Sequence, residues 1–385
     1  MSTAEPHSHA LIVGAGIGGL AAAVALERVG YRVTLLERAS ELREVGFALL
    51  LAANAVQALR RLGVADRVLS QTVPPETGEL RAASGALLRR IDLSALRQVT
   101  GEYAAVALRP VLHGALSEAL QKTELRTGAH VIAFEQDARS VTVQLESGER
   151  LSADVLIAAD GVHSKIRSVL HGDTVRSSGL VGFRGVCEDN TWPIGGAQYL
   201  GRGVEAGVGR ANSNAVYWFT AGRAEAAAAA SGKTGALAML QGFDPALRAL
   251  AERTPEADVR GDVLLDRAPL AHWGRGRVTL LGDAAHPMLP HAGQGGAQAL
   301  EDAVVLGRCL GAINNPAEIL GALKRYEALR VPRANAVAAA ARRNARAADL
   351  TQPWLCAVRD WVLAHGPAAL LEKQLVSLSR VNLDV

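Results

Sequence analysis

Residues 11–20 of this 385-residue chain read LIVGAGIGGL, an apolar run that passes into three glycines spaced G-x-G-x-x-G. An apolar strand that leads through such a turn into a helix is typical of dinucleotide-binding folds. Gly14 permits the tight turn, Gly16 lets the backbone approach a pyrophosphate, and Gly19 lets the helix pack close to the strand. The phosphates are then expected to lie on free N–H groups at the positive end of the helix dipole.

The next segment supports this interpretation. Residues 31–36, YRVTLL, are predicted to form the second strand of the same β-α-β unit, and the strand ends at Glu37. A carboxylate about 20 residues beyond the glycines is placed to accept the hydroxyls of a ribose. The context therefore favours a dinucleotide site over a plain strand–turn–helix.

Composition limits the class of protein. At this length two domains are expected, and 49% of hydrophobic residues is enough for a large core. The formal net charge of +3 and the scattered basic residues argue against nucleic-acid binding. Three widely separated cysteines predict neither a disulfide framework nor a zinc site, and they fit a reducing cytoplasm. Neither a signal peptide nor a transmembrane helix is expected.

Two later strands end in aspartates. Residues 153–159 are apolar throughout, as in parallel strands covered on both faces, and lead into Asp160. Residues 278–281 lead into Asp283. Ligands bind at the carboxyl ends of such strands, so Asp283 is placed to accept from ligand hydroxyls.

Helices are expected at several places in the chain. Arg109 and Pro110 begin one, since proline suits a first turn; a cation has no dipole reason to be there, so Arg109 faces either an anion or solvent. Residues 293–296 begin a long helix that reaches about residue 310. A second is expected over residues 316–330, where Pro332 interrupts it, with further helical sequence beyond. Residues 71–100 and 173–261, by contrast, are predicted to form the strands of a second sheet, except that the alanine-rich residues 224–230 form either a short helix or a mobile loop.

Three separated motifs together resemble the flavin-dependent aromatic hydroxylases of the p-hydroxybenzoate hydroxylase type. They are GAGIGG with Glu37-Arg38, the Asp160-Gly161 turn, and GDAAHPMLPHAGQGGAQALEDA at residues 282–303. The chain looks nearest to the short single-component branch with salicylate-, 3-hydroxybenzoate- and urate-hydroxylase-like enzymes and zeaxanthin-epoxidase-like epoxidases.

The resemblance implies an α/β fold: a Rossmann-like FAD-binding domain of the glutathione-reductase type, an inserted, mostly antiparallel β-sheet substrate domain, and C-terminal helices. The expected ranges are 1–70, 101–172 and 262–345 for the FAD-binding domain, 71–100 and 173–261 for the substrate domain, and 346–385 for the C-terminal helical segment.

The resemblance also implies roles for individual residues. Asp283 holds the ribityl–phosphate region, the glycine loop borders the isoalloxazine ring, and Asp160 contacts both flavin and NAD(P)H. The complete set assigned to the cofactor is Gly14, Ala15, Gly16, Gly19, Glu37, Arg38, Arg43, Arg109, Val131, Asp160, Asp283, Gly293, Gln294, Gly295 and Gly296. No metal is expected, because Asp283, His286 and His291 lack a supporting ligand cluster.

The substrate side is less determined. Arg184 or Arg210 could bind an anionic group, and Tyr217 or His291 could help to remove a proton. Arg210, Tyr217 and His291 are the candidate catalytic residues, and Arg184, Arg210, Tyr217 and Pro290 the candidate substrate contacts. The alternatives are surface or interdomain pairing for the arginines, a core position for Tyr217 and a solvated loop for His291. Residues 289–291 depart from the family pattern, so the substrate is not carried over.

The expected function is that of an FAD-dependent monooxygenase that uses NAD(P)H and O2, with oxygen transfer through the flavin C4a-hydroperoxide that the resemblance implies. Aromatic hydroxylation is favoured; an alkene epoxidase, an FAD-dependent reductase and a non-catalytic carrier are the alternatives. The expected partners are a small aromatic or polyene substrate and O2, in a cytoplasmic monomer or homodimer without membrane insertion.

Overall fold

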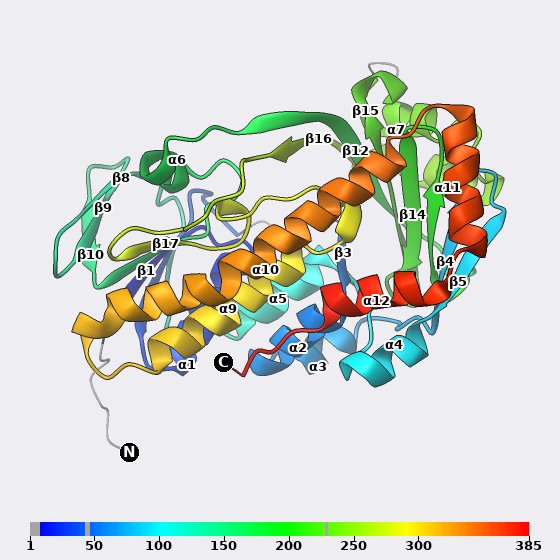
Figure 1. The fold of residues 1–385 in the computed structure, drawn as a ribbon. Coiled ribbons are helices and arrows are strands. Elements are labelled where there is room, and N and C mark those ends of the chain that lie inside the picture. The colour runs from blue at the N-terminus through cyan, green and yellow to red at the C-terminus, as the bar shows by residue number, and fades with distance from the viewer. Residues whose placement is uncertain (1–7, 43–46, 228–229, 385) are drawn as a thin grey trace.

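A five-stranded parallel sheet organises one half of the computed structural model, on the left in Figure 1, and the structure describes residues 8–42, 47–227 and 230–384. The strand order is β17-β11-β1-β2-β7. The strands are β1 (His9–Val13), β2 (Arg32–Leu36), β7 (Glu124–Arg126), β11 (Val155–Ala158) and β17 (Val278–Leu280). This confirms the expected Rossmann-like arrangement, in which β1 pairs in parallel with β2 and β11.

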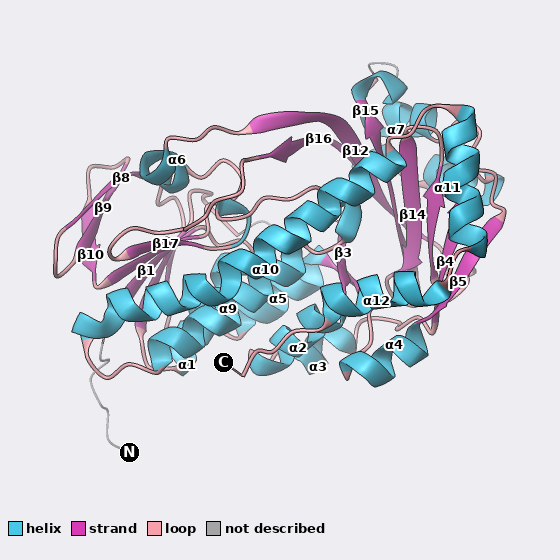
Figure 2. Ribbon diagram, in the orientation of Figure 1, coloured by secondary structure: helices cyan, strands magenta, loops and turns pink. Residues whose placement is uncertain are grey.

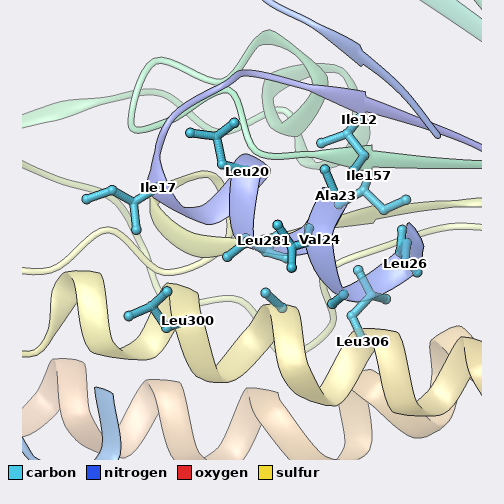
Figure 3. Close-up of a cluster of buried hydrophobic side chains, with 14 of the residues drawn as sticks. Ile12, Ile17, Leu20, Ala23, Val24, Leu26, Ile157, Leu281, Leu300 and Leu306 are labelled. Atoms are coloured by element: carbon cyan, nitrogen blue, oxygen red, sulfur yellow. The ribbon is translucent and has the colours of Figure 1, made fainter. Parts of the chain in front are cut away.

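Helix α1 (Ile17–Arg28) connects β1 to β2 and is almost entirely buried. A helix that is apolar on all sides needs cover on all sides. Figure 3 shows how this cover is provided: Leu20 and Ala23 lie near the strand residues Ile12 and Ile157, and helix α9 (Gly295–Gly311) runs along the opposite side. A Cβ at Gly307 of α9 would come within 2.8 Å of the Ala25 Cβ, so small residues set the close approach of the two helices.

A seven-stranded sheet forms the other half, on the right in Figure 2, in the order β16-β12-β15-β14-β13-β4-β5. Every neighbouring pair is antiparallel except β13 and β4. Its strands are β4 (Thr77–Ala82), β5 (Leu87–Asp92), β12 (Arg176–Glu188), β13 (Gly196–Leu200), β14 (Val204–Arg210), β15 (Ala215–Arg223) and β16 (Val259–Asp266). Helices α7 (Gly232–Met239) and α8 (Pro245–Arg253) cover one face and share a separate hydrophobic core with it.

The smaller elements lie between and beside the two sheets. Residues 93–100, expected as strand, form helix α4 instead, because the Asp92 side chain accepts from the backbone N–H groups of Ser94 and Ala95 and caps it. The others are β3 (Ala48–Leu51), β6 (Ala105–Leu108), β8 (Val131–Gln136), β9 (Val141–Leu145), β10 (Arg150–Ala153), α2 (Ala53–Arg61), α3 (Ala65–Leu69), α5 (Arg109–Glu118) and α6 (Lys165–His171).

The C-terminal part is helical, as expected, but one prediction is wrong. Helix α10 runs without interruption from Ile319 to Ala348, straight through Pro332. Pro332 lies on the exposed side, so the Ala328 carbonyl that loses its helical donor faces water. Buried residues on both sides of it, Tyr326 and Ala334 among them, keep the helix packed. Helices α11 (Pro353–His365) and α12 (Ala368–Ser379) complete the chain.

The proposed domain boundaries stay a prediction, which the two separate sheets and two separate cores support. No helix within the described residues is long and apolar enough to cross a membrane.

Candidate active site

The glycine turn has the geometry of a phosphate cradle. Gly14 has a φ of +100°, and a Cβ there would lie 2.4 Å from the Ala159 carbonyl oxygen. A Cβ at Gly19 would lie 1.8 Å from the Gly14 carbonyl oxygen, so only glycine permits this contact. A Cβ at Gly16, by contrast, would meet no protein atom within 4 Å. The open space therefore lies in front of Gly16, at the N-terminus of α1, where a pyrophosphate is expected.

Glu37 stabilises this turn from the end of β2. Its two carboxylate oxygens accept the backbone N–H groups of Ala15 at 2.8 Å and of Ala39 at 2.9 Å. A ribose contact by Glu37 would use the remaining lone pairs of these oxygens and stays a prediction. Arg38 is exposed beside it, and Arg43 lies outside the described residues.

Arg109 and Asp283 lie close enough to act electrostatically on each other. Arg109 is the first residue of α5, and Asp283 lies in the 3-10 turn η3 (Gly282–Ala284) after β17. Both side chains are accessible to solvent, yet surrounding protein lowers the pKa of Arg109 and raises that of Asp283. Each also acts electrostatically on the other. Groups that are accessible to solvent and yet have perturbed pKa values are typical of ligand sites, and this combination fits the cofactor role expected for both.

Asp160 presents an unsatisfied acceptor. Its Oδ2 accepts the backbone N–H of Lys165 at 3.1 Å, whereas Oδ1 is buried without a partner among the described residues. Burial raises the pKa of this carboxyl. A buried acceptor without a donor is costly, so a ligand hydroxyl or amide at this position is favoured. Together with the space at Gly16, this orphaned oxygen fits an extended dinucleotide such as FAD.

The glycine loop at the start of α9 closes the other end of the site. Gly293 has a φ of +61°, and a Cβ there would lie 3.0 Å from the Leu50 side chain. A Cβ at Gly296 would lie 3.4 Å from Leu49. Small residues and free helical N–H groups are suited to a flat ring that carries negative charge when reduced. The Gln294 side chain points away into the protein, where its Oε1 accepts from Asn54 at 2.8 Å, so only its backbone is left for the cofactor.

The sequence reasoning missed Asp302, which holds these parts together. From α9 it accepts the Gly282 N–H at 2.9 Å, faces His286 Nε2 at 2.6 Å and accepts from Arg330 Nε of α10 at 2.7 Å. The one helix thus carries the glycine loop at its start and fixes the turn that presents Asp283. Two adjacent acids, Glu301 and Asp302, inside a largely apolar helix were the available signal.

The seven-stranded sheet turns an aromatic surface toward this site. Tyr217 and Phe219 lie on the face opposite to α7 and α8, with ring centroids 6.2 Å apart, and both are partly accessible. Burial raises the pKa of Tyr217 to about 12, although Arg184 lowers it. Tyr217 therefore stays a neutral hydrogen-bond donor near neutral pH. Arg184 is half-exposed on the same face and pairs with Asp262.

Arg210 is not where the sequence placed it. It pairs in register with Val216, a core residue on the helix-covered face, and is buried. Its guanidinium donates to the backbone carbonyls of Trp192 and Ser213. This geometry contradicts the expectation that Arg210 contacts substrate, because its donors are occupied on the wrong side of the sheet.

The loop before the glycines supplies the remaining candidates. Pro290 is the exposed first residue of the 3-10 turn η4 (Pro290–Ala292). His291 is buried rather than solvated, and its Nε2 lies 3.6 Å from Oε1 of Glu205 on β14. This contact joins the substrate-side sheet to the loop that leads into the glycines. Val131 begins β8, away from this contact, with its side chain buried.

Comparison with known proteins identifies the family. The model of the FAD binding domain family matches residues 7–195 and 205–341. The chain is 34% identical to an aurachin C monooxygenase/isomerase of Stigmatella aurantiaca, over 91% of this chain and 92% of that protein. It is also 34% identical to a 3-hydroxybenzoate 6-hydroxylase of Polaromonas naphthalenivorans, over 87% of each. Among solved structures, Klebsiella pneumoniae HpxO complexed with FAD and uric acid has a TM-score of 0.88, with 27% identity over 98% of this chain and 97% of that one. The chain is therefore an FAD-dependent monooxygenase that belongs to the single-component FAD aromatic hydroxylase family.

Proposed function

We propose that this enzyme hydroxylates a small, hydroxyl- or N–H-bearing aromatic compound, with NAD(P)H as the reductant and O2 as the oxygen source. The observation that carries the proposal is the contact between Glu205 and His291, which sets the Tyr217–Phe219 surface against the glycine loop. A flat substrate between this surface and the loop lies next to the flavin ring. Relatives named for hydroxylation of 3-hydroxybenzoate and urate support the class of reaction.

When bound, FAD supplies the redox chemistry: it accepts electrons from NAD(P)H and activates dioxygen for transfer of one oxygen atom to the substrate. The residues suited to hold it are the glycine turn, Asp160, Arg109, Asp283 and residues 293–296. The free N–H groups at the start of α9 stabilise negative charge near the ring.

The chain's own residues orient the substrate and exclude water. Phe219 offers a flat apolar surface, and the Tyr217 hydroxyl donates a hydrogen bond to a polar substituent. Val106 of β6 lies against Gly209, where a Cβ would come within 3.0 Å of it, and Gly209 is the register partner of Tyr217, so β6 packs beside the aromatic pair. Water exclusion matters because activated oxygen is otherwise lost to unproductive decay.

The test is an oxygen-electrode assay of the FAD-loaded enzyme with a panel of phenols and N-heteroaromatics. Substrate-stimulated NAD(P)H oxidation, matched by oxygen uptake and by incorporation of 18O from 18O2 into the product, is expected. Product formation without oxygen would instead identify a reductase, and an epoxide product an epoxidase. We place the enzyme in the cytoplasm as a monomer or homodimer, with the three buried free cysteines as support.

A further inference from the structure

A buried acid on strand β14 lies on the sheet face that carries Tyr217 and Phe219. Val204, Ala206 and Val208 belong to the core under α7 and α8, so the alternation of the strand turns Glu205 to the opposite face. Glu205 is 2% exposed and lies on the same sheet surface as Phe219. A carboxyl group in this position needs a reason, since acids are almost never buried unless they are paired.

The partners of Glu205 do not neutralise it. Its Oε2 accepts from Gln198 Nε2 at 3.0 Å, and its Oε1 lies 3.6 Å from His291 Nε2. Burial raises the pKa of Glu205 to about 7, with Gln198 opposing the rise. Burial lowers the pKa of His291 to about 4. The pair is therefore a neutral imidazole beside a carboxyl group that gains or loses its proton near neutral pH.

One nitrogen of this pair is left without a partner. His291 Nδ1 is buried and bonds to none of the described residues. The His291 backbone is fixed, because its carbonyl accepts from Asn344 of α10 at 3.0 Å. A buried ring nitrogen without a partner points to a group supplied from outside the chain.

Other charged groups around the pair are already engaged. Asp349 acts on His291 but is held by Arg223. Arg184 lies two strands away on β12 and pairs with Asp262. Among the described residues, none with a positive charge contacts Glu205. A carboxylate elsewhere on a ring that binds here would therefore lie near this second acid without compensation, and ionisation of both would be disfavoured.

We propose that Glu205 and His291 form the proton-accepting subsite of the cavity, and that it selects a neutral aromatic substrate with a hydroxyl or ring N–H over an aromatic carboxylate. This inference rests on the proposed function. The substrate O–H bond breaks, its proton passes to His291 Nδ1, and the Nε2 proton passes to the Glu205 carboxylate. The electron pair stays on the substrate oxygen and enriches the ring for attack by an electrophilic oxygen. His291 touches the substrate, and Glu205 acts through it.

The test uses one matched pair of ligands, 3-hydroxybenzamide and 3-hydroxybenzoate, which differ in charge and little in shape. Each is titrated into the FAD-loaded enzyme at pH 7.5, with the flavin spectrum as the readout. The neutral amide is expected to bind about tenfold more tightly or better, the scale of a charge left without a partner. Equal binding, or tighter binding of the carboxylate, overturns the proposal.

Variants then test whether Glu205 causes the difference in affinity between the two ligands. Glu205→Gln keeps the shape and is expected to bring the two dissociation constants within about threefold of each other, because the uncompensated acid is gone. The exposed Glu225→Gln is the matched control and should keep the wild-type ratio. With 3-hydroxybenzamide, kcat/KM should rise with pH through about 7 in the wild type, as Glu205 ionises, and lose this rise in Glu205→Gln. A rise that persists in the variant overturns the role of Glu205.

The proton-accepting subsite and the hydroxylase assignment can be refuted separately. Tight binding and turnover of 3-hydroxybenzoate refute the subsite and leave the hydroxylase assignment standing. An FAD-loaded enzyme in which neither ligand binds and no phenol stimulates NAD(P)H oxidation refutes both. If Glu205→Gln does not take up FAD, the wild-type preference and the His291→Asn variant decide: this variant should weaken binding of the amide while FAD stays bound.

Discussion

Replacement of Asp302 by asparagine removes one negative charge from the junction of α9, α10 and the Gly282 turn. Its two oxygens contact three donors, Gly282 N–H, His286 and Arg330, at distances of 2.6 to 2.9 Å, and the side chain is fully buried. Asparagine keeps the volume, but its NH2 group must face one of these donors. The buried Arg330 guanidinium then has less negative charge beside it. The Gly282 turn that presents Asp283 is also bound less strongly.

Two estimates give the free energy of unfolding that Asp302→Asn is expected to lose. Breaking one partner out of a buried ion pair costs about 3–5 kcal/mol. Burial alone would raise the pKa of Asp302, yet His286 and Arg330 lower it to about 2. Against an unfolded value near 3.9, that shift corresponds to about 2.5 kcal/mol. The folded pKa is depressed, so this stabilisation is present above about pH 4 and is lost as the pH falls toward 2.

The assay is urea unfolding of the variant and the wild type, with and without FAD, at pH 7 and at pH 3. Asp66→Asn is the control: Asp66 also lies in a helix and pairs with an arginine, but its side chain is 96% exposed. We expect Asp302→Asn to lose about 3 kcal/mol or more at pH 7 and Asp66→Asn less than about 1 kcal/mol. The difference between Asp302→Asn and the wild type should shrink at pH 3. Equal losses in the two variants, or a difference that does not depend on pH, would refute the reasoning.

Three further changes have definite outcomes. Gly16→Ala should leave the urea midpoint of the apoprotein unchanged but weaken FAD binding. Gly19→Ala should destabilise the fold itself, because its Cβ would lie 1.8 Å from a backbone oxygen. Calorimetry and FAD titration separate these two outcomes. Pro332→Ala should raise the free energy of unfolding by about 1–3 kcal/mol, since the exposed helical position regains an N–H; an unchanged urea midpoint would contradict this. Arg210→Met should lower stability by about 1–3 kcal/mol, because carbonyls lose their donor, and leave the dissociation constant for a phenolic ligand unchanged; a clear loss of affinity would return Arg210 to the site.

The cofactor side of the fold could be read from the sequence because its signals are local. The glycine spacing at residues 14–19, the strand that ends at Glu37 and the aspartates after two other strands each depend on neighbours in the chain. The geometry of Gly14 and Gly19 shows why: each close contact involves backbone, which the pattern of glycines encodes directly.

The substrate side could not be read in the same way, because it depends on which face of a strand a residue takes. Arg210 and Tyr217 are both polar residues on adjacent strands, but the register pairs Arg210 with Val216 and so sends it to the covered face. Glu205 was overlooked since one acid in an apolar strand gives no hint of its partner 86 residues later, His291. The prediction that a helix is interrupted at Pro332 was wrong for a related reason, because tertiary packing overrides a local signal for a helix end.

Helix α10 has a mechanical consequence for catalysis. At 30 residues it is about 45 Å long, and it bonds to the parallel sheet through Tyr326 and to the seven-stranded sheet through Arg342 and Asp266 (Figure 1). One continuous helix that is bonded to both sheets resists a hinge motion between them. We therefore expect admission of substrate and release of product to depend on rearrangement of loops and side chains around a frame of fixed span, so that the distance between the flavin ring and the aromatic surface stays constant through the turnover cycle.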